Sequence, residues 1–478
     1  MKHLKIHPSD NVAVALETTE SVPAGHKFAL RDIQEGETII KYGDPIGTAT
    51  AFIPEGSHVH THNVRTALTG QHEYTYTPAP AWTPPQDEQR SFMGYLRPDG
   101  RAGVRNEIWI IPTVGCVNAP AQQIERAAQK YAGGAIEGIY AYGHPYGCSQ
   151  LGGDMLNTQK ILAGLVRHPN AAGVLVLGLG CENNNIPEFR KVLGEVDETR
   201  VKLLVCQDTE DEVEAGVKLI GEIAEAAKED RRAPLPASML TVGLKCGGSD
   251  GFSGITANPL VGLFSDWLVA QGGRSILTEV PEMFGAEQIL MNRCESREVF
   301  EKTVSLINDF KQYFLSHNQP VYENPSPGNK AGGITTLEDK SLGCTQKGGH
   351  APVADVLAYG DPVRKNGLSL LQSPGNDLVS STALAASGAQ IVLFTTGRGT
   401  PFGCPAPTVK IATNSALFAR KGNWMDFNAG QLLDGVSMEE LRARFIDYAL
   451  ALASGEERTC AEKNGVREMC IFKNGVTL

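Results

Sequence analysis

The chain has 478 residues, of which 41% are hydrophobic and 20% charged, and its formal net charge is −11. This composition is typical of an ordinary globular protein of two or three domains, and the acidic balance argues against nucleic acid or an anionic membrane as a partner. The N-terminal residues lack the apolar core of an export signal, and no apolar run approaches the roughly 20 residues of a membrane span. With ten cysteines, these features predict a cytoplasmic protein with reduced thiols.

Residues 1–74 consist of short alternating apolar runs broken by turns, such as NVAVAL and ETIIKYG. This pattern predicts a small all-β domain. Residues 75–93 begin with TYTPAPAWTPPQDEQR, which carries four prolines and offers little that could form a core. We expect an extended linker there.

A histidine triplet lies near the end of the predicted β domain. HVHTHN places His58, His60 and His62 at alternate positions, and on a strand such residues share one face. Converging imidazoles can bind Fe, Mn or Zn or supply a general base. The alternative is a solvated strand end, and if only one or two of the three act, His60 and His62 are favoured.

From Gly94 onward, apolar strands alternate with helical segments, which predicts a parallel α/β sheet. The break RRAPLPAS at 231–238 divides this body into a middle α/β domain, 94–233, and a C-terminal domain, 234–478. Each apolar strand ends in a polar loop. Because such loops share one edge of a parallel sheet, we expect one composite site, at a domain or subunit boundary.

The segment TVGLKCGGSDGFSG, 241–254, is the most informative of these strand ends. It passes from a buried strand into a glycine loop that carries Lys245, Cys246, Ser249 and Asp250, and a helix is expected from about 258 to 270. Glycine lets the backbone approach a ligand closely. The segment therefore predicts part of a binding site.

Other glycine-rich strand ends carry cysteines. Cys148, Cys181 and Cys246 could bind a metal or an iron–sulfur cluster together, or could be small residues in tight turns. The sequence contains no CxxC pair, so the local evidence for zinc or a cluster is weak. His144 lies in the same loop as Cys148.

Glu279 and Glu282 follow another apolar strand. A pair of carboxylates suits a divalent metal, although two glutamates in a loop are often simply solvated. The rigid loop NPSPGNKAGG adds Asn324 and Lys330 as polar groups for a substrate, or as surface residues.

The segment TTGRGTPFGCPAP, 395–407, places Arg398 among Gly397, Gly399 and Thr400. A guanidinium binds a carboxylate through two hydrogen bonds, and the neighbouring amides can form an anion-binding nest. This loop predicts binding of a substrate carboxylate. Motifs for dinucleotides, nucleoside triphosphates, zinc proteases and α/β hydrolases are absent from the sequence.

Several long, unusual strings together resemble one known family. GRAGVRNEIWIIPTVGCVN, GHPYGCSQLGGD, GLGCEN, KCGGSDGFSGITANP, NPSPGNKAGG and FTTGRGTPFGCPAP resemble the body of the altronate/galactarate dehydratase family, and KIHPSDNVAVAL through HVHTHN resembles its N-terminal SAF domain. The resemblance covers nearly the whole chain. It implies an α/β protein with a small β-clip (SAF) domain and a two-part α/β body, the last domain being a variant Rossmann-like parallel sheet.

The resemblance also implies an activity, which is metal-dependent dehydration of D-altronate to 2-dehydro-3-deoxy-D-gluconate. The expected cofactor is one Fe²⁺ or Mn²⁺ ion rather than an iron–sulfur cluster, and the expected assembly is a homodimer or higher homo-oligomer. The candidate bases are His60, His62 and His144, followed by Lys245, and the acid is another of these histidines or a metal-bound water. The candidate metal ligands are Cys246, Asp250, Glu279, Glu282 and His58. The candidate substrate contacts are Arg398, Gly397, Gly399, Thr400, Asn324, Lys330 and Ser249.

Four alternatives remain open from the sequence. Related enzymes of the family act on galactarate or remove sulfite from sulfolactate. An iron–sulfur hydro-lyase would use Cys148, Cys181 and Cys246. A sugar-acid binding protein without activity is disfavoured, because so many ionisable residues follow the strands.

Overall fold

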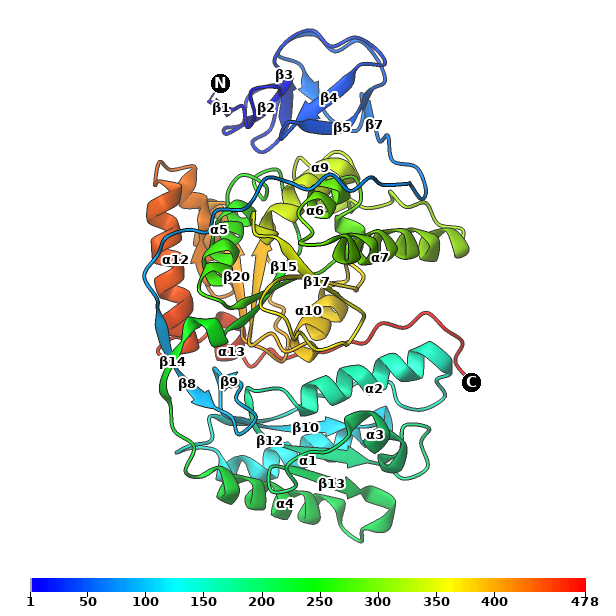
Figure 1. Ribbon diagram of the computed structural model, residues 1–478, viewed down its shortest axis with the longest axis vertical. Helices are drawn as coiled ribbons and strands as arrows, with labels where there is room; N and C mark the ends of the chain where they lie inside the picture. Colours follow the sequence, from blue (N-terminus) through cyan, green and yellow to red (C-terminus); the bar gives the residue numbers. More distant parts are fainter. Residues whose placement is uncertain (1) are drawn as a thin grey trace.

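The computed structural model describes residues 2–478. Its parts follow one another along the long axis: the N-terminal strands at one end, a seven-stranded sheet with its helices in the middle, and a four-stranded sheet with its helices at the other end (Figure 1). No helix within residues 2–478 is long and apolar enough to cross a bilayer.

The N-terminal strands form two small antiparallel sheets with one shared apolar core. The orders are β1-β2-β3-β6 and β4-β5-β7, and Ile39, Ile46 and Ile53 are buried in the core. The strands are β1 (His3–Leu4), β2 (Val12–Ala15), β3 (Lys27–Ala29), β4 (Thr38–Lys41), β5 (Asp44–Ala49), β6 (His58–Val59) and β7 (Val64–Arg65). The predicted strand content of this part is confirmed.

An extended segment connects these strands to the rest of the chain. Residues 66–90 contain no helix or strand and cross the C-terminal part as a strap (Figure 1). Tyr74 donates a hydrogen bond to Glu287, and Tyr76 donates one to the carbonyl of Cys294, each over 2.6 Å. A three-stranded sheet follows, formed by β8 (Ser91–Leu96), β9 (Ala102–Gly103) and β14 (Ala233–Pro236).

The middle part is a parallel sheet covered by helices on both faces. Its order is β11-β10-β12-β13. In β10, Ile108 and Ile110 face α1 and α4, whereas Trp109 and Ile111 face α2 and α3, as the alternation of side chains along a strand requires. The elements are β10 (Glu107–Pro112), α1 (Asn118–Ala128), β11 (Gly138–Ala141), α2 (Gly152–Val166), β12 (Ala171–Gly178), α3 (Ile186–Leu193), β13 (Val201–Val205) and α4 (Glu212–Ala227).

The C-terminal sheet is parallel throughout, which confirms the predicted sheet type. Its order is β17-β18-β16-β15-β19-β20-β21. The strands are β15 (Thr241–Cys246), β16 (Arg274–Leu277), β17 (Val353–Leu357), β18 (Gly367–Leu371), β19 (Ile391–Thr396), β20 (Thr408–Ala412) and β21 (Phe427–Asn428). The helices are α5 (Ala257–Ala270), α6 (Glu287–Asn292), α7 (Arg297–Ser316), α8 (Pro327–Ala331), α9 (Leu337–Cys344), α10 (Asp377–Ala386), α11 (Ser415–Arg420), α12 (Met438–Ala453) and α13 (Cys460–Lys463).

The order of the C-terminal strands reverses between β15 and β19. From β15 the chain adds β16 on one side and later adds β19, β20 and β21 on the other. In open α/β sheets, ligands bind beside the carboxyl ends of the strands at such a switch point. The loops after β15 and β19 are the loops that the sequence predicts as binding segments.

Candidate active site

Two glycine loops pack against each other at this switch point. The backbone amides of Gly397 and Arg398, after β19, donate hydrogen bonds to the carbonyl of Gly248, after β15, over 3.1 and 2.9 Å. A Cβ atom at Gly397 would lie 2.1 Å from Cγ of Asp250. Only glycine therefore allows the loops to approach this closely.

Asp250 ties these loops together. Its carboxylate accepts hydrogen bonds from the Thr413 hydroxyl at 3.0 Å, from Ser253 at 3.1 Å and from Asn414 at 3.2 Å. Burial raises the pKa of the Asp250 carboxyl, and these donors only partly oppose the shift. The local bonds give Asp250 an orienting function, and its role as a metal ligand stays a prediction.

The anion nest expected around Arg398 is not free in the structure. The amides of Gly397 and Arg398 bond to Gly248, and the amide of Gly399 donates to the Thr396 hydroxyl over 2.8 Å. The Arg398 side chain is exposed, and its guanidinium has no ion pair among residues 2–478. The guanidinium of Arg398 thus remains available to an anion, whereas the amides of residues 397–399 do not.

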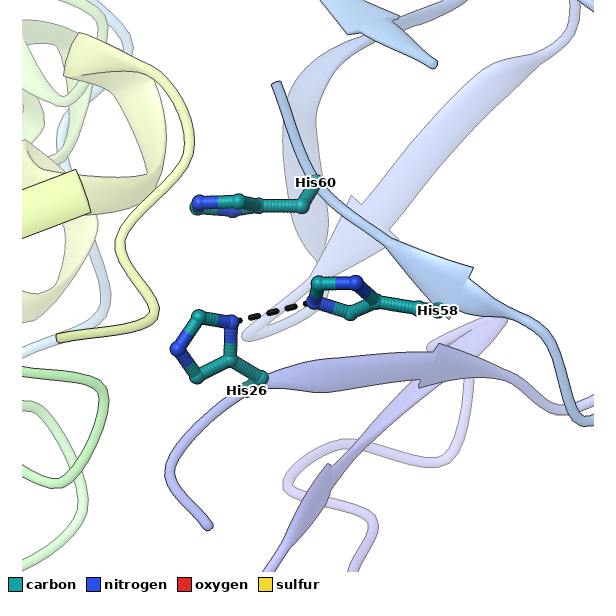
Figure 2. Close-up of side chains that lie close together, drawn as sticks. All are labelled: His26, His58 and His60. Atoms are coloured by element: carbon teal, nitrogen blue, oxygen red, sulfur yellow. Dashed lines mark hydrogen bonds between the residues drawn. The ribbon is translucent and has the colours of Figure 1, made fainter. Parts of the chain in front are cut away.

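Three imidazoles converge where the N-terminal strands face the C-terminal part (Figure 2). His26 Nδ1 lies 3.0 Å from His58 Nε2, and the ring centroid of His60 lies 5.0 Å from that of His26. One nitrogen from each ring lies within 4.8 Å of the others. His62, which is exposed, lies outside this group, although its ring centroid is 5.4 Å from that of His58.

A buried ion-pair triad anchors the N-terminal strands to the C-terminal part. Asp339, on α9, accepts hydrogen bonds from Lys27 Nζ at 2.7 Å and from Lys41 Nζ at 2.9 Å, and all three side chains are almost fully buried. Lys27 Nζ also donates to the carbonyl of Gly333 over 2.8 Å. The two lysines hold the pKa of Asp339 well below its usual range, although burial opposes the shift.

This anchoring places the three converging imidazoles of His26, His58 and His60, called the histidine group below, against the end of α8 and the segment between α8 and α9. His26 Nε2 lies 3.4 Å from the carbonyl oxygen of Ala331, and His60 Nδ1 lies 3.0 Å from the Thr335 hydroxyl. Gly332, which follows Ala331 in the chain, accepts a hydrogen bond at its carbonyl from the amide of Gly251 over 2.7 Å. The imidazoles therefore lie beside the glycine loop that follows β15.

The histidine group is electrically neutral near pH 7. Burial, with neighbouring imidazoles and Lys27, lowers the pKa of His58 to about 4. Burial, then Lys27 and His26, lowers the pKa of His60 to about 3. Neutral imidazole is the form that binds a metal. This donor set fits a divalent ion, and imidazole suits Fe²⁺ better than Mn²⁺, which prefers oxygen ligands.

A second group of metal-ligand types lies buried below the glycine loops. Glu282 Oε2 lies 3.1 Å from Cys246 Sγ and 3.3 Å from Cys344 Sγ. A hydrogen bond from Cys344, with the Lys347 ammonium, lowers the pKa of Cys246 to about 6 against the effect of burial. Cys246 is then a thiolate at neutral pH.

Lysines already neutralise this second group. Lys347 Nζ lies 3.0 Å from Cys246 Sγ, and Lys340 Nζ lies 2.8 Å from Glu282 Oε1. Despite burial, these ammonium groups hold the pKa of Glu282 well below its usual range. An added cation would face nearby positive charges in a low dielectric, so this group fits a metal less well than the three imidazoles do.

Lys245 is held as an ammonium. Its Nζ contacts Glu279 and lies 2.9 Å from Asp377. Although burial lowers the pKa of Lys245, these carboxylates outweigh it and raise the pKa above the usual value. A firmly protonated amine cannot accept a proton, which disfavours the predicted role of Lys245 as a base.

Two of the remaining predicted substrate contacts, Asn324 and Ser249, lie close to Lys340. Its Nζ lies 3.0 Å from Asn324 Oδ1 and 3.2 Å from Asn329 Oδ1. Asn329 donates to the carbonyl of Ser249 over 2.9 Å. The hydroxyl of Ser249 is buried without a hydrogen-bond partner. Lys330 directly precedes Ala331, whose carbonyl faces His26. Thr400 lies in the same loop as Arg398, two residues after it.

His144, Cys148 and Cys181 lie elsewhere, in the middle part at the far end of the molecule (Figure 1). His144 is buried, and its Nε2 lies 2.7 Å from the carbonyl of Pro112. Burial lowers its pKa to about 4. The structure does not bring these three residues to the histidine group or to Cys246, so Cys148, Cys181 and Cys246 cannot share one cluster within a chain.

Sequence reasoning missed four residues of these groups and of the ion-pair triad, which are His26, Asp339, Cys344 and Lys347, whereas Lys340 in LEDKSLG is a predicted polar candidate. His26 stands alone in GHKFAL and joins the triplet only because β3 pairs with β6. The other three lie in LEDKSLGC and TQKGG, but the sequence contains no signal that α9 returns beneath the glycine loops.

Family models match three stretches of this chain. Residues 16–67 match the altronate/galactarate dehydratase SAF domain. Residues 94–228 match the second domain of D-galactarate dehydratase/altronate hydrolase. Residues 237–477 match the C-terminal domain of D-galactarate/altronate dehydratase.

Full-length relatives agree with these matches. The chain is 54% identical to altronate dehydratase of Escherichia coli (strain K12), over 100% of both chains. It is 55% identical to altronate dehydratase of Bacillus subtilis (strain 168), over 99% of both. It is 32% identical to galactarate dehydratase (L-threo-forming) of Escherichia coli (strain K12), over 98% of this chain and 96% of the relative. The chain therefore belongs to the D-galactarate/altronate dehydratase family.

Proposed function

We propose that this protein is a hydro-lyase that converts D-altronate into 2-dehydro-3-deoxy-D-gluconate and water. The relatives named altronate dehydratase are 54% and 55% identical to the chain, against 32% for the galactarate dehydratase. The structural observation that carries the proposal is the neutral group of His26, His58 and His60, held beside the glycine loops of the switch point.

The difficult step in this reaction is loss of the C2 proton beside the carboxylate. Its removal places a second negative charge on that carboxylate. Fe²⁺ or Mn²⁺ held by His26, His58 and His60 would stabilise this charge by several kcal/mol. Arg398 would bind the same carboxylate through its guanidinium and orient C2.

His62 is the best placed of the predicted bases. His58 and His60 have pKa values too low for an efficient base near pH 7, and Lys245 is protonated. His62 is exposed beside His58. After accepting the C2 proton, its imidazolium can protonate the departing 3-hydroxyl, which leaves as water, and the enol product tautomerises to the keto acid. A positioned acid–base group contributes about 10²–10⁴ in rate.

A substrate panel tests the proposed reaction. We expect the protein, assayed without oxygen in the presence of Fe²⁺ or Mn²⁺, to form a 2-keto-3-deoxy acid faster from D-altronate than from galactarate. Release of sulfite from sulfolactate should be negligible. A preference for galactarate or sulfolactate would contradict the proposal, and binding of D-altronate without water loss would favour a non-catalytic protein.

Replacing Arg398 with lysine should weaken substrate binding. Lysine keeps the charge but cannot present two parallel donors to a carboxylate. Loss of one charge-assisted hydrogen bond of about 1.5–3 kcal/mol predicts a rise in KM of about 10- to 150-fold. Steady-state kinetics measure this change, and Arg420→Lys on α11 is a matched control. Unchanged KM and kcat in Arg398→Lys would exclude the carboxylate contact.

The element order supports a division into domains that we also propose. It comprises a β-clip domain at 1–74, a linker at 75–93, a middle α/β domain at 94–233 and a variant Rossmann-like domain at 234–478. We further propose a homodimer or higher homo-oligomer, which light scattering coupled to size-exclusion chromatography would test.

A further inference from the structure

The exposed cysteines of this protein gather at one edge of the middle sheet. Among residues 2–478 all ten cysteines are free, and only Cys116, Cys148 and Cys181 are exposed. Cys116 follows β10, Cys148 follows β11 and Cys181 follows β12. These three strands are neighbours and parallel, so the three thiols lie at one carboxyl edge, where α/β sheets bind ligands.

Hydrogen bonds join the three loops that carry these cysteines. The amide of Gly115 donates to the carbonyl of Tyr146 over 2.9 Å, and the amide of Asn184 donates to the carbonyl of Gly147 over 3.0 Å. The amide of Ser149 donates to Asn183 Oδ1 over 2.8 Å. The loop that carries Cys148 therefore contacts both the loop of Cys116 and the loop of Cys181.

Buried polar contacts fix this edge. The Glu182 carboxylate, next to Cys181, accepts hydrogen bonds from the Thr113 hydroxyl and the Gly180 amide, each over 2.6 Å. At the end of the chain, the amide of Leu478 donates to the carbonyl of Ser149 over 2.9 Å. The thiols are thus exposed on loops that the fold holds in place, which is how ligands are prepared for a metal centre.

The three thiols do not form a group compact enough to surround a single ion. Two thiolates on one zinc ion, each about 2.3 Å from it, lie no more than about 4.6 Å apart. The three sulfur atoms do not all lie within 4.8 Å of one another, whereas the ligand atoms of the two other groups do. An iron–sulfur cluster places its thiolates on different iron atoms and so accepts a wider arrangement.

Two further candidate ligands at this edge, His144 and Cys206, are engaged elsewhere. His144 lies at the same edge, but both ring nitrogens are engaged, by the carbonyl of Pro112 at 2.7 Å and the amide of Tyr146 at 3.1 Å. Cys206, after β13, packs against the apolar core. Three thiolates would thus hold three irons of a four-iron cluster, and the fourth iron would face solvent.

We propose that Cys116, Cys148 and Cys181 bind a [4Fe–4S] cluster. Each thiol releases one proton and forms one iron–sulfur bond, and the iron and sulfide come from outside the chain. This site is separate from the histidine group, because the middle part lies at the opposite end of the molecule from the N-terminal strands (Figure 1). The proposal therefore does not rest on the proposed function.

Anaerobic reconstitution of the full chain with iron, sulfide and a thiol reductant tests this proposal. We expect about four iron and four sulfide per chain, a brown colour and a broad visible absorption band. Cys116→Ser, Cys148→Ser and Cys181→Ser should each lose most of the sulfide and the band. Circular dichroism would verify that the variants fold.

Two controls sharpen the test. Cys206→Ser, at the same edge but half-buried against the apolar core, and Cys246→Ser, in the C-terminal part, should both keep the cluster. Binding of zinc alone, no bound sulfide in the wild-type chain, or a disulfide between the exposed cysteines in place of a cluster would overturn the proposal. Loss of the cluster in Cys206→Ser or Cys246→Ser would likewise overturn the assignment of its ligands.

Discussion

Replacing His58 or His60 with alanine is expected to lower turnover of D-altronate by about three orders of magnitude and to remove the divalent metal. Each change deletes one of only three ligands, and the metal supplies several kcal/mol of charge stabilisation, at about 1.4 kcal/mol per tenfold in rate. Steady-state kinetics and elemental analysis after gel filtration measure the two losses.

The metal content of the variants distinguishes the metal ligands His58 and His60 from a catalytic base such as His62. His62→Ala should lower kcat by about 10²–10⁴ while keeping the metal, because His62 lies outside the group of three. His317→Ala, at the exposed end of α7, should change neither quantity. If His58→Ala and His60→Ala keep both metal and turnover, the histidine group is not the catalytic metal site.

The loop after β15 could be predicted from the sequence because its signals are local. Residues 241–246 form an apolar run, which predicts a buried strand, and the following glycines indicate a close backbone approach. The structure contains both, and α5 begins at Ala257, one residue from the predicted start. The parallel pairing of the strands could also be predicted, because the alternation of strands and helices is read directly along the sequence.

The composition of the metal groups could not be predicted, because it depends on pairing between distant segments. His26 meets His58 across 32 residues, and Cys344 meets Cys246 across 98. Three of the amides expected to form an anion nest at Gly397–Thr400 are engaged for a related reason. Whether an amide is available to an anion depends on the acceptor opposite it, which for Gly397 and Arg398 is the carbonyl of Gly248 in the loop after β15.

The charged partners of Lys245 could not be predicted from the sequence either. Lys245 beside Cys246 in the sequence suggested a base, yet Glu279 and Asp377 keep it protonated. Nothing in the sequence of β15 indicates which carboxylates will face its lysine, because they follow β16 and β18. The residue types of a site can thus be predicted from strand ends, whereas their protonation requires the assembled sheet.

Replacing Asp339 with asparagine is expected to destabilise the contact between the N-terminal strands and the C-terminal part by about 3–5 kcal/mol. The variant keeps the shape of the side chain but leaves the ammonium groups of Lys27 and Lys41 buried without a counter-charge. Whole domains are stable by only about 5–15 kcal/mol. We therefore expect earlier urea unfolding, faster proteolysis in residues 66–90 and lost turnover, because the histidines leave the glycine loops.

The pH dependence of this loss identifies its cause. The folded pKa of Asp339 lies well below its usual value of 3.8, so its ionised form stabilises the fold fully above about pH 4, and this contribution disappears as the pH falls. The difference in stability between wild type and Asp339→Asn should therefore be full near pH 6 and shrink below pH 4. Asp361→Asn, which breaks the more exposed pair with Lys160, should cost less than about 1 kcal/mol at any pH. An equal loss in the two variants, or a loss at Asp339 that does not change with pH, would mean that the buried triad is not what anchors the N-terminal strands.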